Sequence, residues 1–120
     1  MSFEKLRVYH AAQQLDKIVF GMIEKIASPG RLRSLIDDLN RALASITSNI
    51  AEAYGSDTPG RKVYHLSVAR GSTDEVRAKL QTLVNRKAFN AVEIVKPSIL
   101  ARTIAKMLTS WIDRLKDDAG

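Results

Sequence analysis

Cysteine is absent from this sequence of 120 residues. Its absence excludes disulfide bonds and thiolate metal sites, so the composition gives no sign of an oxidising compartment. The first ten residues, MSFEKLRVYH, contain no apolar stretch of the kind found in signal peptides. Long apolar runs are missing as well, since no stretch approaches the ~20 residues needed to span a bilayer. We therefore predict a cytoplasmic protein that does not contact a membrane.

Proline and glycine are scarce, at three and six residues, and several of them gather in two short breaks. Ser28-Pro29-Gly30 and the segment from Gly55 to Gly60 interrupt apolar residues that otherwise recur at spacings of three and four. This spacing is helical, and no segment alternates as a strand. The predicted helices span about residues 4–27, 31–54, 60–88 and 91–117. Four such helices predict one all-α domain over residues 1–120, an antiparallel up-down-up-down four-helix bundle.

One apolar stripe along each predicted helix supplies the expected core. In chain order the stripes are Val8, Ala12, Leu15, Val19, Met22 and Ile26; Leu32, Leu35, Ile36, Leu39, Ala42, Leu43, Ile46 and Ile50; Leu66, Ala69, Thr73, Val76, Leu80 and Leu83; and Leu100, Ile104, Met107, Leu108, Trp111, Ile112 and Leu115. The single tryptophan, Trp111, lies in the fourth stripe, and we expect it in the core rather than on a binding surface.

The start of the fourth helix has two interpretations. Asn90 followed by Glu93 fits an N-cap with an acidic residue three positions on, and Pro97 would then kink the helix. Alternatively, the helix starts at Pro97, because proline fits the first helical position. We favour the earlier start because Val92 and Val95 extend the apolar stripe backward.

Positive charge is concentrated in residues 61–90, which carry seven basic residues against only Asp74 and Glu75. The net charge of this segment is +5, out of +6 for the whole chain. Such asymmetry favours an anionic partner, RNA or DNA above all, although a solvated helix face would look the same. The candidate nucleic-acid contacts are Arg61, Lys62, Arg70, Arg77, Lys79, Arg86 and Lys87.

The third predicted helix has a second uncharged face opposite its core stripe, made mostly of small residues. Gly71 lies on it, and a glycine inside a helix costs ~1 kcal/mol relative to alanine. Small side chains on an outward face let another backbone approach closely, and a second copy of the chain is the simplest candidate. The alternative is that these are ordinary exposed residues. The candidate oligomer interface consists of Tyr64, Ser67, Gly71, Ala78 and Thr82.

A polar ledge runs along the edge of the second stripe, in the segment SITSNIAEAYG. Its members Ser45, Asn49 and Glu52 require partners if partly buried, and the third helix offers Ser72 and Glu75. A catalytic interpretation would pair His65 with Glu52 or Ser45, but the sequence shows no activating neighbour for a nucleophile or base. The Glu-x-x-His metal motif and the lysine of a phosphate-binding loop are also missing. We therefore predict a structural network, with no catalytic residues, metal or cofactor.

The ledge and the segment that follows it resemble a known family. This is the four-helix-bundle family of the 23S rRNA intervening-sequence proteins, which also includes the accessory variability protein of diversity-generating retroelements. The matching positions are Leu39, Arg41, Ala42, Ser45, Ile46, Asn49, Ile50, Ala51 and Glu52, then Ala69, Gly71, Ser72 and Glu75, with Phe3, Leu6, Val8 and Tyr9 near the start. Departures from the family pattern are Asp38 and Ala53, and Pro97 is also unusual. Tyr9 matches the family only as an aromatic residue, because the family often has tryptophan there.

The resemblance implies a bundle that assembles into a homopentamer, without known catalytic residues. For the retroelement branch it implies contacts with nucleic acid and a reverse transcriptase. We predict a non-enzymatic homo-oligomer, pentameric by the resemblance, that binds RNA or DNA through its basic surface. The alternative is a protein–protein scaffold that docks a nucleic-acid enzyme such as a reverse transcriptase.

Overall fold

A computed structural model describes residues 6–119, which form four α-helices and, in that part of the chain, no strand. The helices are α1 (Arg7–Glu24), α2 (Arg33–Gly55), α3 (Pro59–Asn85) and α4 (Val95–Ala119), with a short 3-10 helix, η2 (Pro29–Leu32), before α2. The predicted all-α class is confirmed. Phe3 and the expected helix start at residue 4 lie outside the described residues.

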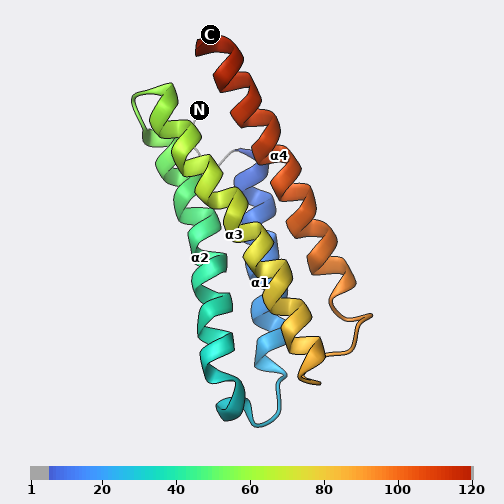
Figure 1. The fold of residues 1–120 in the computed structure, drawn as a ribbon. Coiled ribbons are helices and arrows are strands. Elements are labelled where there is room, and N and C mark those ends of the chain that lie inside the picture. The colour runs from blue at the N-terminus through green and yellow to red at the C-terminus, as the bar shows by residue number, and fades with distance from the viewer. Residues whose placement is uncertain (1–5, 120) are drawn as a thin grey trace.

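The four helices pack side by side in a rod of 50 × 21 × 21 Å, and each runs opposite to the one before it (Figure 1). The most extensive packing joins α3 to α2 and α3 to α4. The helix α1 packs against α2 and α4 as well, but not against α3, so α1 and α3 lie diagonally opposite. This arrangement is the predicted four-helix bundle.

The predicted breaks end and begin helices by identifiable contacts. Ser28 adopts a left-handed conformation with φ 52°, and Pro29 then starts η2. At the second break Thr58 is the N-cap of α3, because its Oγ1 accepts a hydrogen bond from the backbone N–H of Arg61 at 3.2 Å. Pro59 occupies the first position of α3, where its missing N–H costs nothing. A short loop therefore turns the chain sharply between α2 and α3.

The apolar stripes of α2 and α3 form the centre of the core, and all of their predicted members are buried. In α1 the members from Val8 to Val19 are buried as well. Met22 and Ile26 are half-buried, since they lie at the end of α1 where the bundle gives less cover. Helical periodicity therefore predicted the core of the first three helices with little error.

The core side of α4 differs from the predicted stripe. Its buried residues are Pro97, Ala101, Ile104, Leu108 and Ile112, whereas Met107 and Trp111 are half-buried and pack against the edge of the core. The apolar residues of α4 cover a broad arc of the helix. The predicted centre of its buried face is therefore one residue away from the centre in the structure. Small Ala101 occupies the centre because α4 packs closely on α3. Trp111, expected in the core, therefore lies at the edge of the core and is half-buried.

The capping contacts expected at Asn90 are present, but they enclose a turn rather than the first turn of α4. The Asn90 N–H donates to Glu93 Oε1 and the Glu93 N–H donates to Asn90 Oδ1, both at 2.9 Å. The helix α4 begins at Val95, and Pro97 lies in its first turn, where an N–H has no helical partner in any case. Val92 and Val95 are 80% and 51% exposed, so they do not extend the core stripe. Phe89 and Ile94 are the buried residues of this connection.

Candidate nucleic-acid interface

The seven candidate basic residues differ in how far they are free to meet an anion. Arg61, Arg86 and Lys87 are exposed and make no side-chain hydrogen bond or ion pair within residues 6–119. Arg77 is exposed too, and its nearest carboxylate oxygen is that of Asp74 at 3.8 Å. These four side chains can approach a phosphate without giving up a strong contact. We call them the exposed α3 cations.

Lys62 has an intramolecular role instead. Its Nζ donates to the backbone oxygens of Ala53 at 3.0 Å and Tyr54 at 3.1 Å, at the end of α2. The last carbonyls of a helix lack helical partners and carry partial negative charge, so an ammonium group there is favourable. Lys62 therefore ties the start of α3 to the end of α2.

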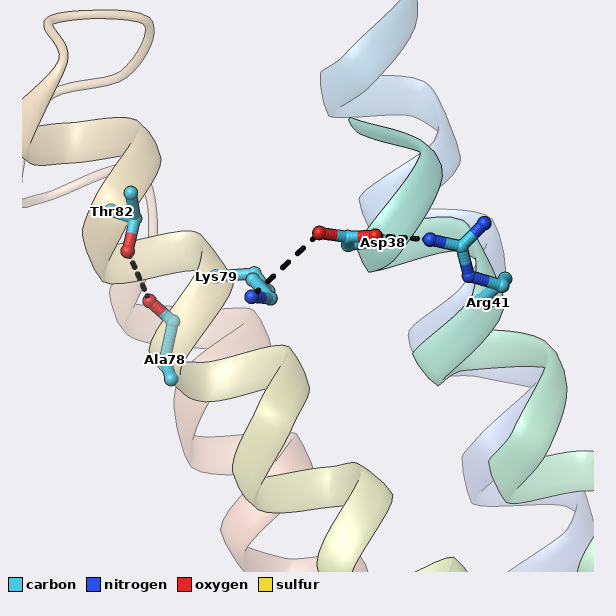
Figure 2. Close-up of polar contacts among 5 residues, drawn as sticks. All are labelled: Asp38, Arg41, Ala78, Lys79 and Thr82. Carbon is cyan, nitrogen blue, oxygen red and sulfur yellow. Dashed lines mark hydrogen bonds and ion pairs between the residues drawn. The ribbon is translucent and has the colours of Figure 1, made fainter. Parts of the chain in front are cut away.

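Arg70 and Lys79 also contact neighbouring helices. Arg70 Nη1 donates to Thr109 Oγ1 of α4 at 3.2 Å. Figure 2 shows Lys79 reaching from α3 towards Asp38 of α2, with Nζ 4.0 Å from Oδ2, while Asp38 also binds Arg41 on its own helix. A half-buried pair at the limit of ion-pair distance contributes little stability, so Lys79 is restrained rather than sequestered. Both residues are weaker candidates for phosphate contacts than the exposed α3 cations.

Lys87 stands where the chain leaves α3, and its φ of 64° is left-handed. The following residue, Ala88, donates its N–H back to Leu83 O at 2.9 Å, which closes the helix end. Glycine is the usual residue at such a position because it has no Cβ. Lys87 thus keeps a basic side chain at a site where local backbone preference favours glycine.

The polar ledge joins α2 to α3 through three of its five predicted members and one residue that was not included. Ser72 Oγ donates to Ser45 Oγ at 2.8 Å, and Asn49 Nδ2 donates to Ser45 O at 2.9 Å and to Ser45 Oγ at 3.2 Å. Asn49 Oδ1 lies 3.0 Å from His65 Nδ1. Glu52 and Glu75 are exposed, and neither side chain joins this network.

His65 was not included in the predicted network. The catalytic alternative would have paired it with Glu52 or Ser45, whereas the structure places Asn49 beside it. Because α2 and α3 are antiparallel and joined by a tight turn, residues at similar distances from the turn lie opposite each other. This alignment could have indicated the contact between His65 and Asn49. The cross-contacts step away from the turn in order: Lys62 with Ala53, His65 with Asn49, Ser72 with Ser45, and Lys79 with Asp38.

The hydrogen bonds of the ledge leave its groups poorly suited to catalysis. Because Asn49 Nδ2 donates to Ser45, its Oδ1 is the acceptor and His65 Nδ1 is the donor. Asn49 thereby orients the imidazole, but the two serine hydroxyls bind each other and are not paired with it. In the described part of the chain, no group of three or more His, Asp or Glu side chains could hold a metal ion. The ledge links two helices, and none of its contacts activates a nucleophile.

The candidate oligomer interface lies on the outward side of α3. Tyr64 is 64% exposed, Gly71 and Ala78 are exposed, and Ser67 and Thr82 are half-buried. A Cβ built on Gly71 would meet no atom within 4 Å, so the fold of one chain does not require glycine there. The Thr82 hydroxyl donates to Ala78 O at 3.0 Å within α3 (Figure 2).

A shallow groove of about 610 Å³ continues this outward side onto the beginning of α4. Asp74, Arg77 and Ala78 line it from α3, and Ile94 and Val95 line it from the other side. Exposed apolar side chains, Val92, Val95 and Ile99, extend along the start of α4. The groove thus connects the small-residue strip, through Ala78, with the exposed apolar side chain of Val95.

A protein-family model described as 23S rRNA-intervening sequence protein matches residues 4–110 of this chain. No curated protein and no solved structure matches it. The family match covers most of the chain, including all of α2 and α3, and confirms the predicted family. The link with diversity-generating retroelements has no counterpart in these comparisons and stays a prediction. Among residues 6–119 no helix has the length and apolar character to cross a membrane.

Proposed function

The chain belongs to the family of 23S rRNA-intervening sequence proteins, and we propose that it is a non-enzymatic, cytoplasmic homo-oligomer that binds RNA or DNA through the exposed α3 cations. The observation that carries this proposal is the placement of Arg61, Arg77, Arg86 and Lys87. All four are exposed, and only Arg77 has a carboxylate nearby. Side chains of this kind neutralise phosphates whatever the base sequence.

Self-association makes such a surface effective. The small-residue strip of α3 runs between a row with Arg61, Lys79 and Arg86 and a row with Arg70 and Arg77, by their helical spacing. Packing of the strip against a second copy would bring the basic rows of neighbouring copies together. Weak phosphate contacts repeated in each copy then add by avidity. Five copies are the number that the family resemblance suggests.

The oligomeric state is tested by light scattering at micromolar concentration. We expect a mass several times the 13.3 kDa of one chain. A mass of 13.3 kDa over the whole concentration range would contradict self-association. The experiment also fixes the stoichiometry for the binding measurements.

Nucleic-acid binding is tested by a gel shift titrated with salt, using RNA, single-stranded DNA and duplex DNA. We expect affinity to fall steeply with salt, with little sequence preference. The double variant Arg61→Glu/Arg86→Glu should weaken binding. It should also reduce the slope of log affinity against log salt concentration by about one unit per lost phosphate contact. Lys17→Glu/Arg33→Glu, at exposed positions outside α3, is the matched control. Affinity that is independent of salt, or equal loss in both double variants, would contradict the proposal.

The alternative function is a scaffold that docks a nucleic-acid enzyme, and the exposed apolar residues at the start of α4 favour it. Val92, Val95 and Ile99 suit a protein surface better than a phosphate backbone. A partner retained in a pull-down after nuclease treatment would support the scaffold. Loss of every partner on nuclease treatment would support direct nucleic-acid binding.

A further inference from the structure

A second groove lies towards the end of the bundle where α1 begins and α4 ends. Its volume is about 850 Å³, and it is formed by the start of α1, the end of α2 and the second half of α4. Val8, Tyr54, Met107 and Trp111 give it apolar and aromatic walls. Two guanidinium groups, those of Arg7 and Arg114, line it as well. We call it the α1–α4 groove.

The orientation of α4 shapes this groove. The core of α4 is centred on Ile104, Leu108 and Ile112, which leaves Met107 and Trp111 on its flank. The single tryptophan therefore forms part of a groove wall and is half-buried.

The walls of the groove define the ligand chemistry that fits it. A volume of this size is typical of sites for small organic groups, which are mostly apolar with a few polar contacts. Unpaired nucleobases stack on aromatic side chains, and their phosphates are met by nearby cations. Arg7 and Arg114 are exposed and make no ion pair within residues 6–119. Asp113 also lines the groove, so the local charge excess is small and stacking must supply much of the affinity.

We propose that the α1–α4 groove binds an unpaired nucleobase of a single-stranded RNA or DNA, stacked on Trp111, with Arg7 and Arg114 at its phosphates. A base inside a duplex is already stacked and paired, so the groove selects single strands. This inference rests on the proposed nucleic-acid binding and adds a second contact region to it. The exposed α3 cations hold the strand by charge, and the groove discriminates strand from duplex.

The presence of only one tryptophan provides a direct test. A dye-labelled single strand of about ten nucleotides, as RNA and as DNA, and the corresponding duplex are titrated with the full chain. Dye anisotropy reports binding anywhere on the protein, whereas tryptophan emission reports the groove alone. We expect single strands to quench the emission saturably, at the same concentrations at which anisotropy rises. Duplex should raise anisotropy without quenching.

Variants separate stacking from charge. Trp111→Leu should weaken single-strand binding about tenfold or more and leave duplex binding unchanged, while Trp111→Phe should retain most of the affinity. Arg114→Gln should weaken single-strand binding more than Arg102→Gln, an exposed arginine of the same helix outside the groove. If Trp111→Leu does not fold, the phenylalanine variant and the arginine pair decide the question.

The possible failures are distinguishable. Strand binding seen by anisotropy without any change in tryptophan emission would overturn the groove site and leave the proposed function intact. Equal effects of Arg114→Gln and Arg102→Gln, or equal loss of strand and duplex binding in Trp111→Leu, would also overturn the groove site. If none of the nucleic acids binds to the protein, both proposals would be overturned.

Discussion

The side of α3 that faces α2 differs from the side that faces outward. Contacts within one chain account for the residues on the first side but not for those on the second. On the side facing α2, Lys62, His65, Ser72 and Lys79 each contact a partner on α2. On the outward side, Gly71 stands in open space. At the end of α3, Lys87 holds a left-handed backbone that favours glycine.

This difference separates structural residues from candidate functional ones. Sequences usually satisfy local preference, packing and hydrogen bonding together, and depart from them where function requires it. The contacts between α2 and α3 depart from none of these preferences, since every buried polar side-chain atom described has a partner. Gly71 and Lys87 each depart from local backbone preference, and within residues 6–119 no side-chain hydrogen bond or ion pair compensates for either. We therefore look for function on the outward side and at the ends of α3.

The largest expected effect belongs to the contacts between α2 and α3. Replacing Asn49 with alanine removes a donor to Ser45 and the acceptor for His65, so the half-buried His65 Nδ1 loses its partner in the network. We expect Asn49→Ala to lower the free energy of unfolding by about 1–3 kcal/mol, measured by urea denaturation. Glu52→Gln, at an exposed position outside the network, should change it by less than about 0.5 kcal/mol. Equal stability of both variants and the parent would contradict a structural role for the ledge.

The second prediction tests the outward side of α3. The substitution Gly71→Ala should stabilise an isolated chain but weaken an assembly of several chains. In an isolated chain, Gly71→Ala adds a Cβ that meets nothing and improves the helix, so the free energy of unfolding should rise by about 1 kcal/mol. In an assembly packed across this strip, the same Cβ would separate the two backbones and weaken association. We expect both results. The Gly71→Ala variant should be more stable than the parent at concentrations where the chain is monomeric, and its oligomer should dissociate at a higher protein concentration than the oligomer of the parent does.

Light scattering over a dilution series and urea denaturation at two protein concentrations measure these effects. Ala78→Ser, at another exposed position of the strip, changes side-chain volume little and serves as the control. A Gly71→Ala protein that gains stability and keeps the association constant of the parent would show that the strip is not an interface.

The sequence predicted the fold well, because the helical period of the apolar residues and the positions of the helix breaks depend only on residues close together in the chain. The buried residues of α2 and α3, and most of those of α1, follow directly from it. The centre of α4 did not, because Met107 and Trp111 are as apolar as the residues that are buried, and only packing on α3 chooses between them. Periodicity gives a helix face, and the neighbouring helices decide which part of a broad face is covered.

Side-chain partners were harder to predict than the fold. The position of His65 beside Asn49 depends on the length of the turn at Gly55–Gly60, which sets how α2 and α3 are aligned. Likewise the basic residues looked alike in the sequence, but Lys62 caps α2 while Arg61, its neighbour, is exposed. The α1–α4 groove had no signal in the sequence, because its walls come from three helices that are distant along the chain.

The smallest expected effect concerns Lys87, where stability and the proposed function should respond in opposite directions. Lys87→Gly relieves a left-handed backbone at the end of α3 and should raise the free energy of unfolding by about 0.5–1 kcal/mol, measured by urea denaturation. The same variant removes one exposed cation and should weaken RNA binding at low salt by a small factor. Arg86→Ala removes the neighbouring exposed charge, whose backbone φ of −94° is not left-handed, so it should weaken RNA binding similarly without the gain in stability. If Lys87→Gly binds RNA like the parent while Arg86→Ala does not, Lys87 lies outside the nucleic-acid interface, and the contact surface ends with the last turn of α3.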